Sequence, residues 1–233
     1  MNGPVAEIPE PMLPSYTMHG QIPVTTQVCS NNTLAEPRLR LEIETLIAKA
    51  KRRERNYYAC DKHLFAALVD YPIVDKDVVV FGSQEPWYEA VCLAEGARPT
   101  TIEYNVRNYQ HPGIKTYTVE DANAACLPLF DIAISISSFE HDGLGRYGDP
   151  LDPDGDLKAM DVARSRIKVG GLMFLAVPVG KDELRWNAHR VYGPVRLPVL
   201  LGSWEVMGTY GLPERPFEQE RWVQPVFVLK RTC

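Results

Sequence analysis

The sequence has few cysteines, and none of them lies in the spacing that metal sites and redox motifs use. Five cysteines are scattered along 233 residues, an odd number without any C-x-x-C pair. A disulfide framework and a structural zinc site both need cysteines at regular or close spacings. We therefore expect neither of them, and we predict no bound metal.

The chain also lacks long apolar runs and an excess of positive charge. It has no stretch of about eighteen apolar residues, so we expect no membrane span. Its first residues have neither the basic segment nor the apolar core of a secretory signal, which favours a cytoplasmic protein. The formal net charge is −5, and an acidic chain lacks the basic surface that binds a phosphate backbone. Nucleic acid is therefore not an expected partner.

Proline content and apolar periodicity divide the chain into three parts. Residues 1–35 contain several prolines and little periodicity, which is typical of an extended or disordered arm. Apolar residues recur near the helical period in residues 36–72, which predicts a helical segment. Residues 73–233 alternate short apolar runs with amphipathic segments, which predicts one further domain of strands and helices.

The order of these elements predicts the fold. We expect helices over residues 36–55, 61–68, 87–95 and 156–167, and strands over 78–81, 100–103, 115–118, 132–136, 172–177, 204–210 and 223–229. Strands that alternate with helices form a parallel sheet, which binds ligands at the carboxyl ends of its strands. The prediction is therefore an α/β, Rossmann-like doubly wound sheet, mostly parallel, with an antiparallel C-terminal edge and preceding N-terminal helices.

A glycine turn is followed by an acid at the end of the next strand, with the sequence separation that is typical of nucleotide-binding folds. Gly82 and Ser83 follow the first predicted strand, and Glu103 ends the second about twenty residues later. Such a turn lets the backbone approach the ligand, and such an acid accepts hydrogen bonds from ribose hydroxyls. These three residues are therefore candidate cofactor-binding residues, although Glu103 could also be a surface acid at a strand end.

Four segments resemble a known family. Residues 82–89, 101–105, 138–150 and 187–193 resemble a nematode-rich family, domain of unknown function 268, which is itself similar to class I S-adenosylmethionine-dependent methyltransferases. The resemblance covers most of residues 35–233 and implies the class I methyltransferase fold with S-adenosylmethionine as cofactor. It also implies that Glu120 and Asp121 lie near the adenine amino group. Ser137 follows the fourth predicted strand at the same edge of the sheet and is a further candidate cofactor-binding residue.

The glycine turn departs from the methyltransferase pattern, which has an acid followed by three glycines at alternate positions. Here Val80 takes the place of the acid, and the glycine places hold Gly82, Gln84 and Pro86. Gln84 and Pro86 are expected to crowd the approach of the backbone to the cofactor. The missing acid is the one that steadies the ammonium end of the cofactor, and Glu85 or Glu89 could substitute for it. A catalytically inactive binding module with a decayed cofactor loop is therefore the alternative to an active methyltransferase.

A polar, glycine-rich loop over residues 140–156 follows the fourth predicted strand, and loops of this composition often carry function. Glu140 and His141 are the candidate catalytic residues, because an imidazole can take a proton from a hydroxyl or an amine near neutral pH. Arg146 could clamp an anionic or sugar-like substrate. The candidate substrate-binding residues are Asp142, Arg146, Tyr147, Asp149, His189 and Arg190. The expected substrate is a small polar molecule, such as one related to a sugar or a glycan.

Two other interpretations of this loop stay open. In one, oxygen ligands and imidazoles form a manganese or iron site from Glu140, His141, Asp142, Asp149 and His189. In the other, the loop has a structural role, with Arg146 paired to Asp149 and His141 capping the next helix.

The segment over residues 185–193 follows the fifth predicted strand. A helix here would put Arg185 and His189 on one face, where they could close over a substrate. The alternative is that Trp186 packs into the core.

Overall fold

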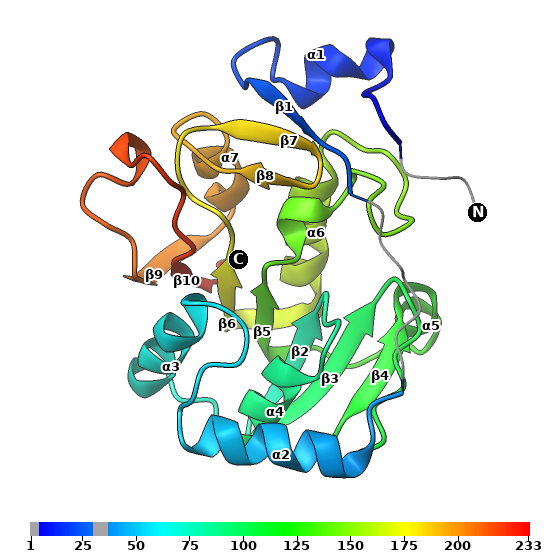
Figure 1. Cartoon of the computed structure of the whole chain (residues 1–233). Coiled ribbons are helices and arrows are strands. Elements are labelled where there is room, and N and C mark those ends of the chain that lie inside the picture. Colours follow the sequence, from blue (N-terminus) through cyan, green and yellow to red (C-terminus); the bar gives the residue numbers. More distant parts are fainter. Residues whose placement is uncertain (1–4, 30–36) are drawn as a thin grey trace.

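A computed structural model of the chain describes residues 5–29 and 37–233, and its centre is a seven-stranded sheet (Figure 1). The strands of this sheet are β2 (Asp77–Phe81), β3 (Arg98–Glu103), β4 (Lys115–Thr118), β5 (Phe130–Ile136), β6 (Ile167–Ala176), β9 (Glu205–Tyr210) and β10 (Val226–Lys230). Their order across the sheet is β4-β3-β2-β5-β6-β10-β9. Strands β4, β3, β2, β5 and β6 are parallel, while β10 runs antiparallel to both β6 and β9. The predicted fold class is confirmed.

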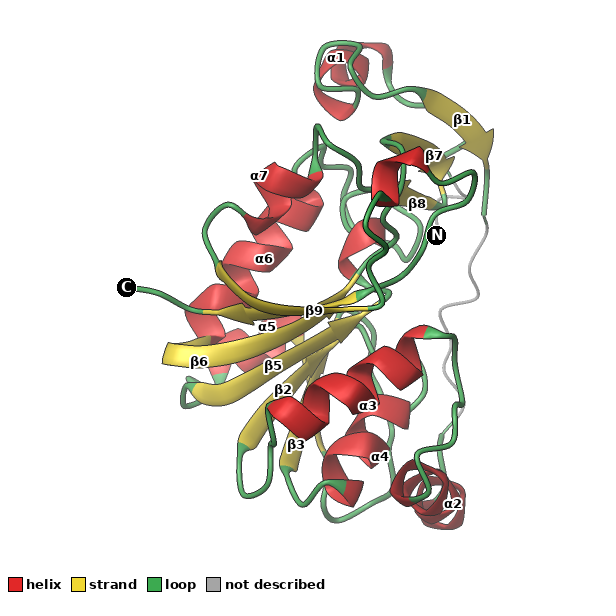
Figure 2. Cartoon of the chain, turned by 90° about the vertical axis from the view of Figure 1, so that its left-hand side faces the viewer, coloured by secondary structure: helices red, strands yellow, loops and turns green. Residues whose placement is uncertain are grey.

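Helices cover both faces of this sheet (Figure 2). One layer consists of α2 (Arg40–Lys51), α3 (Cys60–Asp70) and α4 (Trp87–Ala94), and the other of α5 (Val119–Ala124), α6 (Gly155–Arg166) and α7 (Leu197–Leu201). Successive side chains of a strand point to opposite faces. Val78 and Val80 accordingly pack in the core under α3 and α4, whereas Val79 and Phe81 pack under α5, α6 and α7. This double burial explains why the sequence of β2 is a continuous apolar run.

A second, smaller sheet joins the N-terminal arm to the later part of the chain. The arm contains η1 (Glu10–Met12), α1 (Leu13–Tyr16) and β1 (Val24–Gln27), and β1 pairs in parallel with β7 (Glu183–Asn187). Strand β7 in turn pairs antiparallel with β8 (His189–Val191). Residues 5–29 are therefore folded rather than extended or disordered. Residues 1–4 and 30–36, which hold the rest of the expected arm and the expected helix start, lie outside the described residues.

The helix considered for residues 185–193 is wrong, because these residues form β7 and β8. The interior of β7 alternates between half-buried and buried positions, with Leu184 and Trp186 facing inward. Strand β1 supplies the backbone hydrogen-bonding partners that stabilise this extended conformation. Trp186 is 2% exposed and packs against Tyr16 and Leu144, so the interpretation of this tryptophan as a core residue is correct.

Two further properties of the described residues bear on the class of protein. All five cysteines are free thiols. No helix within residues 5–29 and 37–233 has the length and apolar character needed to cross a membrane. The division of the chain at residues 35 and 72 remains a prediction.

Candidate functional site

A cavity of about 410 Å³ opens at the carboxyl ends of β2, β3 and β5. Gly82 follows β2, Glu103 ends β3 and Ser137 follows β5, and all three line the cavity. In a doubly wound sheet this edge is where ligands bind, and the volume lies in the usual range for small-molecule sites. The parallel strands thus bring together residues that are more than fifty positions apart in the chain.

The cavity includes many of the predicted site residues but not all of them. Those that line it are Gly82, Ser83, Glu103, Ser137, His141, Asp142, Tyr147 and Asp149. Those outside its lining are Glu120, Asp121, Glu140, Arg146, His189 and Arg190. The predicted roles of all these residues remain hypotheses, and their surroundings show what each side chain can do.

The turn after β2 needs glycine at position 82. Gly82 has a φ of +70°, which disfavours other residues, and a Cβ atom there would lie 1.7 Å from the Ser138 hydroxyl oxygen. Of the residues expected to crowd this turn, Gln84 lines the cavity. Pro86 is buried at the N-cap of α4 and is not among the lining residues.

A buried acid that the sequence analysis considered only as a substitute for the missing acid supports this turn from behind. The carboxylate of Glu89 accepts a hydrogen bond from the Thr101 hydroxyl at 2.6 Å and lies 3.0 Å from the Ser83 hydroxyl. Ser83 has one hydroxyl proton, and the carbonyl of Glu85 lies 2.9 Å away as a second acceptor. A protonated Glu89 would donate to the Ser83 hydroxyl, which could then donate its own proton to the Glu85 carbonyl. Burial raises the pKa of Glu89 to about 7, in keeping with this arrangement.

Neither nearby glutamate takes the place of the missing acid as an unpaired carboxylate. Glu89 is fully buried and does not line the cavity. Glu85 lines the cavity, but its carboxylate pairs with the Arg38 guanidinium at 2.7 Å. The position of the missing acid itself is filled by Val80, which is 1% exposed.

Glu103 presents a largely buried carboxylate at the end of β3. Its Oε1 accepts the backbone N–H of Tyr104 at 2.9 Å, and its Oε2 lies 3.8 Å from the Arg107 guanidinium. Burial raises the pKa of Glu103, and Arg107 opposes that shift. The carboxylate retains lone pairs for hydrogen bonds from a ligand in the cavity.

The two acids expected near an adenine amino group lie on the first turn of α5. Both are exposed, and Asp121 forms a reciprocal cap with Thr118, whose hydroxyl accepts its backbone N–H at 3.0 Å. The α5 residues that do line the cavity are Val119 and Asn123. Asn123 is thus a cavity residue that the sequence analysis missed, one helical turn from the predicted pair.

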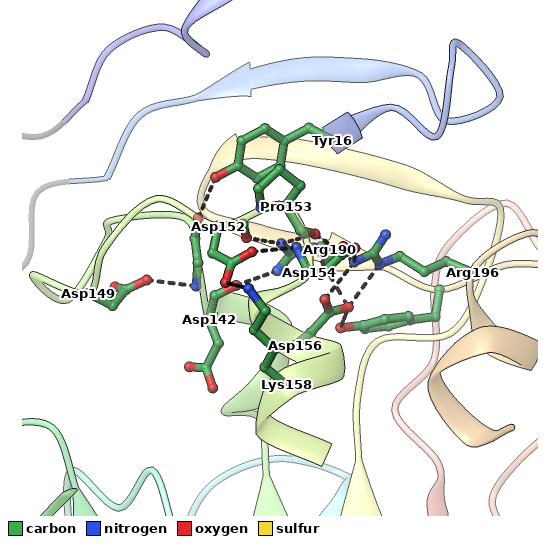
Figure 3. Close-up of polar contacts among 12 residues, drawn as sticks. Tyr16, Asp142, Asp149, Asp152, Pro153, Asp154, Asp156, Lys158, Arg190 and Arg196 are labelled. Atoms are coloured by element: carbon green, nitrogen blue, oxygen red, sulfur yellow. Dashed lines mark hydrogen bonds and ion pairs between the residues drawn. The ribbon is translucent and has the colours of Figure 1, made fainter. Parts of the chain in front are cut away.

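The loop between β5 and α6 is shaped by its own polar groups. Asp149 accepts backbone N–H groups from Gly143, Gly145 and Tyr147 at 2.7, 3.1 and 3.1 Å (Figure 3 shows the first of these). The carboxylate therefore closes the loop on itself. This supports a structural role for Asp149, although its partners are backbone groups rather than the Arg146 side chain that the structural interpretation named.

Arg190 links the two ends of this loop through hydrogen bonds to backbone carbonyls. Its guanidinium donates to the carbonyls of Asp142, Asp152 and Pro153 at 2.7, 3.4 and 3.2 Å (Figure 3). The side chain is 3% exposed and lies outside the cavity lining. In this structure Arg190 therefore positions the loop rather than contacting the cavity.

A buried ion pair anchors the start of α6 beside Arg190. Arg196 contacts both oxygens of Asp156 at 2.6 and 2.9 Å, and Tyr192 donates to the same carboxylate at 2.9 Å. Burial alone would raise the pKa of Asp156, but the guanidinium groups of Arg190 and Arg196 hold it below its usual value. The helix that follows the loop is thus fixed by a fully bonded carboxylate.

His141 is a neutral imidazole, and one of its two ring nitrogens is already hydrogen-bonded within the protein. Its Nδ1 lies 2.6 Å from the carbonyl oxygen of Ala188, so this nitrogen donates and carries the proton. Its Nε2 faces Oε1 of Glu140 at 3.8 Å. Burial lowers the pKa of His141 to about 3, which leaves a weak base. The histidine does not cap the next helix, contrary to the structural interpretation of the loop.

Glu140 lies behind the cavity rather than in its wall. The carboxylate is 1% exposed and accepts the Ser137 hydroxyl at 2.9 Å. Burial raises the pKa of Glu140 to about 7. This acid would therefore act on the cavity only through its neighbours Ser137 and His141, which line it.

Arg146 and His189 lie near one another on the β8 side of the loop. The Arg146 guanidinium donates to the carbonyl of Ala188 at 2.9 Å and lies over the Tyr147 ring. The ring of His189 lies 6.2 Å from that of His141. No group of three or more His, Cys, Asp or Glu side chains in the described parts of the chain could hold a metal ion, so no observation supports the metal-site interpretation.

Comparison with known proteins identifies the family. The model of the family described as Caenorhabditis protein of unknown function, DUF268, matches residues 75–221. The chain belongs to this family. The matched residues include the cavity-lining turn after β2, the end of β3 and the loop before α6. No curated protein sequence matches the DUF268 chain.

Solved structures similar to this DUF268 chain include methyltransferases. One is the 1,6-didemethyltoxoflavin-N1-methyltransferase of Burkholderia thailandensis with bound S-adenosylhomocysteine, at a TM-score of 0.52 and 15% identity, covering 82% of this chain and 80% of that chain. Another is an S-adenosylmethionine-dependent methyltransferase of Clostridium acetobutylicum, at a TM-score of 0.52 and 10% identity, covering 83% and 99%. TehB of Haemophilus influenzae has a TM-score of 0.51 and 15% identity, covering 80% and 67%. At these identities the similarity shows the class I methyltransferase-like fold alone.

Proposed function

We propose that the chain is an S-adenosylmethionine-dependent methyltransferase that acts on a small polar substrate, such as a sugar derivative. The observation that carries this proposal is the cavity at the carboxyl ends of β2, β3 and β5, with Gly82 and the buried carboxylate of Glu103 in its wall. Gly82 allows close approach of the backbone, and Glu103 retains acceptors for two ribose hydroxyls.

The charge of the cavity wall also fits the proposed cofactor. Acidic residues outnumber basic ones in the lining, which contains Glu85, Glu103, Asp142, Asp149 and Asp152 against Lys158 and Arg166. S-adenosylmethionine brings two positive charges, its sulfonium and its ammonium, and one negative charge, its carboxylate, so that it is a net cation. A wall rich in carboxylates stabilises such a ligand.

The residues present suggest how the cofactor would be held. Glu103 would bind the ribose, and the backbone around Gly82 and Ser83 would lie along the amino-acid end. The cofactor would supply a methyl group activated by its attachment to a positively charged sulfur. The protein's own contribution would be to position the acceptor in line with that group and to exclude water.

One observation favours an inactive binding module as a second candidate. The acid that steadies the cofactor ammonium is replaced by buried Val80, and the carboxylates of Glu85 and Glu89 already have partners. A decayed cofactor site on the same fold would look like this.

Calorimetric titration with S-adenosylmethionine and S-adenosylhomocysteine separates the two candidates. A methyltransferase should bind both ligands with micromolar affinity. Replacing Glu103 by Gln removes a charged acceptor and should weaken both ligands by about tenfold or more. Glu205→Gln is the matched control, because Glu205 is exposed on β9 and is not among the cavity-lining residues.

The opposite outcome is equally clear. Wild-type protein that binds neither ligand at millimolar concentration would contradict the methyltransferase proposal and favour the binding module. Wild-type binding that Glu103→Gln leaves unchanged would contradict the role of Glu103 alone.

A further inference from the structure

Asp142 differs from the two ionisable residues that precede it in the loop after β5. Glu140 is outside the cavity lining, and His141 has its Nδ1 committed to the Ala188 carbonyl. Asp142 lines the cavity, and no hydrogen bond or ion pair from within residues 5–29 and 37–233 reaches its carboxylate. Figure 3 shows this carboxylate pointing away from the contacts that fasten the loop. It is therefore available to a ligand.

The backbone of Asp142 is held firmly. Its carbonyl accepts the Arg190 guanidinium at 2.7 Å, and its N–H donates to the Phe139 carbonyl at 3.2 Å. The next residue, Gly143, is held by Asp149 and by the Tyr16 hydroxyl. A side chain on such a fixed backbone is preorganised for binding.

The surroundings of Asp142 favour a positively charged ligand. Burial raises the pKa of Asp142, and the carboxylates of Asp149 and Glu103 raise it further, with Arg190 opposing them.

The cations of the cavity wall already have partners. Lys158 pairs with Asp152 at 2.5 Å, and Arg166 donates to Asn123. Among the described residues, no free cation of the wall offsets the cost of burying an ionised Asp142 beside Asp149 and Glu103. A positively charged ligand would offset it.

We propose that Asp142 binds the methyl-accepting group of the substrate as an ammonium and takes a proton from it, so that the substrate is an amine. This inference rests on the proposed function and names the substrate class of the same site. An amino sugar or another small polar amine would fit both the small polar substrate of the proposed function and the amine of this inference.

The Asp142 carboxylate takes one N–H proton from the ammonium, which leaves a neutral amine with a lone pair and a neutral carboxyl group. When the nitrogen then bonds to the methyl carbon supplied by S-adenosylmethionine, the carbon–sulfur bond breaks and its electron pair goes to sulfur. The methylated ammonium and S-adenosylhomocysteine are the products. The raised pKa of Asp142 makes it a better base than an ordinary aspartate.

Sinefungin tests this inference without knowledge of the substrate, because it carries an amino group on the carbon that replaces the sulfur of S-adenosylhomocysteine. That amino group would lie where the methyl group and its acceptor meet. Calorimetry should show wild-type protein binding sinefungin at least tenfold more tightly than S-adenosylhomocysteine. Asp142→Asn should abolish this preference and leave the affinity for S-adenosylhomocysteine within twofold of wild type.

Asp152→Asn is the matched control, since Asp152 lines the same cavity but has Lys158 as a partner, and it should keep the preference. Equal wild-type affinities for the two ligands would overturn the inference without any variant. An Asp142→Asn variant that loses affinity for both ligands equally would also overturn it, and would place Asp142 at the amino-acid end of the cofactor. Wild-type protein that binds neither ligand contradicts the proposed function itself, which is a distinct result.

Discussion

Glu89 is the single residue whose protonation state bears most directly on the turn that carries Gly82 and Ser83. Its neutral form can donate to Ser83 while accepting from Thr101, whereas its ionised form leaves Ser83 with more acceptors than it has protons. The raised pKa of this buried acid therefore links the cavity to the pH of the solution.

Replacement of Glu89 by Gln should remove part of the pH dependence of stability. In the unfolded chain Glu89 ionises near 4.5, and in the folded protein burial raises its pKa to about 7. Its contribution to the free energy of unfolding is thus full below about pH 4.5 and is lost as the pH rises through 7, by up to about 3 kcal/mol. Glutamine reproduces the bonding of the neutral acid, so the variant should be more stable than wild type at pH 8.

Urea unfolding at pH 5 and pH 8 measures this effect. Other buried groups also change the stability in this range, because burial raises the pKa of Glu140 to about 7 and lowers that of His141 to about 3. The effect of Glu89 is therefore the difference between the two proteins: from pH 5 to pH 8 the wild type should lose up to about 3 kcal/mol of stability relative to Glu89→Gln. An unchanged decline in Glu89→Gln would show that Glu89 is ionised in the folded protein at neutral pH.

Gly82→Ala should destabilise the protein for two separable reasons. The positive φ costs an alanine about 1–2 kcal/mol, and the new Cβ would collide with the Ser138 side chain, which adds about 1–3 kcal/mol. Ser138→Gly removes the atoms that collide. In that background Gly82→Ala should cost only the backbone part, and a double-mutant cycle by chemical denaturation measures the difference. Additive effects would contradict the contact.

At the scale of elements, the loop over residues 142–155 is defined by bonds from its neighbours to its backbone. Asp149 accepts hydrogen bonds from backbone N–H groups, and Arg190 donates hydrogen bonds to backbone carbonyls. The ion pair of Asp156 with Arg196 fixes the helix that follows. These contacts place Asp142 and Asp149 in the cavity wall. The stability of α6 and the shape of the cavity are therefore connected.

Asp156→Asn should show the strength of this connection. Removing one partner of a buried ion pair leaves the guanidinium of Arg196 without its compensating charge, which costs about 3–5 kcal/mol. Asp154→Asn is a matched control, because its side chain is 61% exposed and lies 3.7 Å from the same arginine, so its effect should stay within about 0.5 kcal/mol. Urea denaturation compares them, and similar values for both variants would contradict the anchoring role of Asp156.

The sequence predicted those elements whose signals are local. Strands β2, β5 and β10 are largely apolar runs, β3 carries the β-branched residues Thr100, Thr101 and Ile102, and the helices next to them show a clear period or a terminating residue such as Gly96. Strands β7 and β8 were missed, because their extended conformation depends on pairing with β1 near the other end of the chain. No property of residues 183–191 alone reveals that partner.

The candidate site was predictable to a similar degree. Gly82, Glu103 and Asp142 follow strands, and strand ends meet at one edge of a parallel sheet, so sequence order alone brings them together. The use of Arg190 and Arg146 to bind backbone carbonyls could not be predicted, because it depends on where distant loops cross. The partners of Glu89 could not be predicted for the same reason, since one acid within an apolar helix gives no sign of the side chains that it contacts.

At the scale of the whole molecule, the small sheet connects the first residues of the chain to the candidate site. Tyr16 and Ile22 of the arm pack with Leu144 of the loop and with Leu184 and Trp186 of β7. The Tyr16 hydroxyl also donates to the Gly143 carbonyl at 2.5 Å. The arm is therefore part of the structure that holds the cavity wall.

Ile22→Ala should test whether the arm folds cooperatively with the rest. Ile22 is 4% exposed, and truncating such a residue costs about 2–4 kcal/mol when its surroundings unfold together. Ile8→Ala, in a half-buried part of the same arm, should cost clearly less. Chemical denaturation followed by tryptophan fluorescence measures both variants, and a negligible effect of Ile22→Ala would mean that the arm detaches independently.

The parallel pairing of β1 with β7 also has a consequence for folding during synthesis. Val24 pairs with Leu184 and Gln27 with Asn187, so β1 is made 160 residues before the strand with which it pairs. Contacts between such distant residues form slowly, because the chain between them must be ordered first. Until then the apolar side chains of the arm stay exposed to solvent, where newly made chains are most prone to associate with one another. The arm that supports the cavity wall is thus a segment of the nascent chain that depends on protection until β7 has been made.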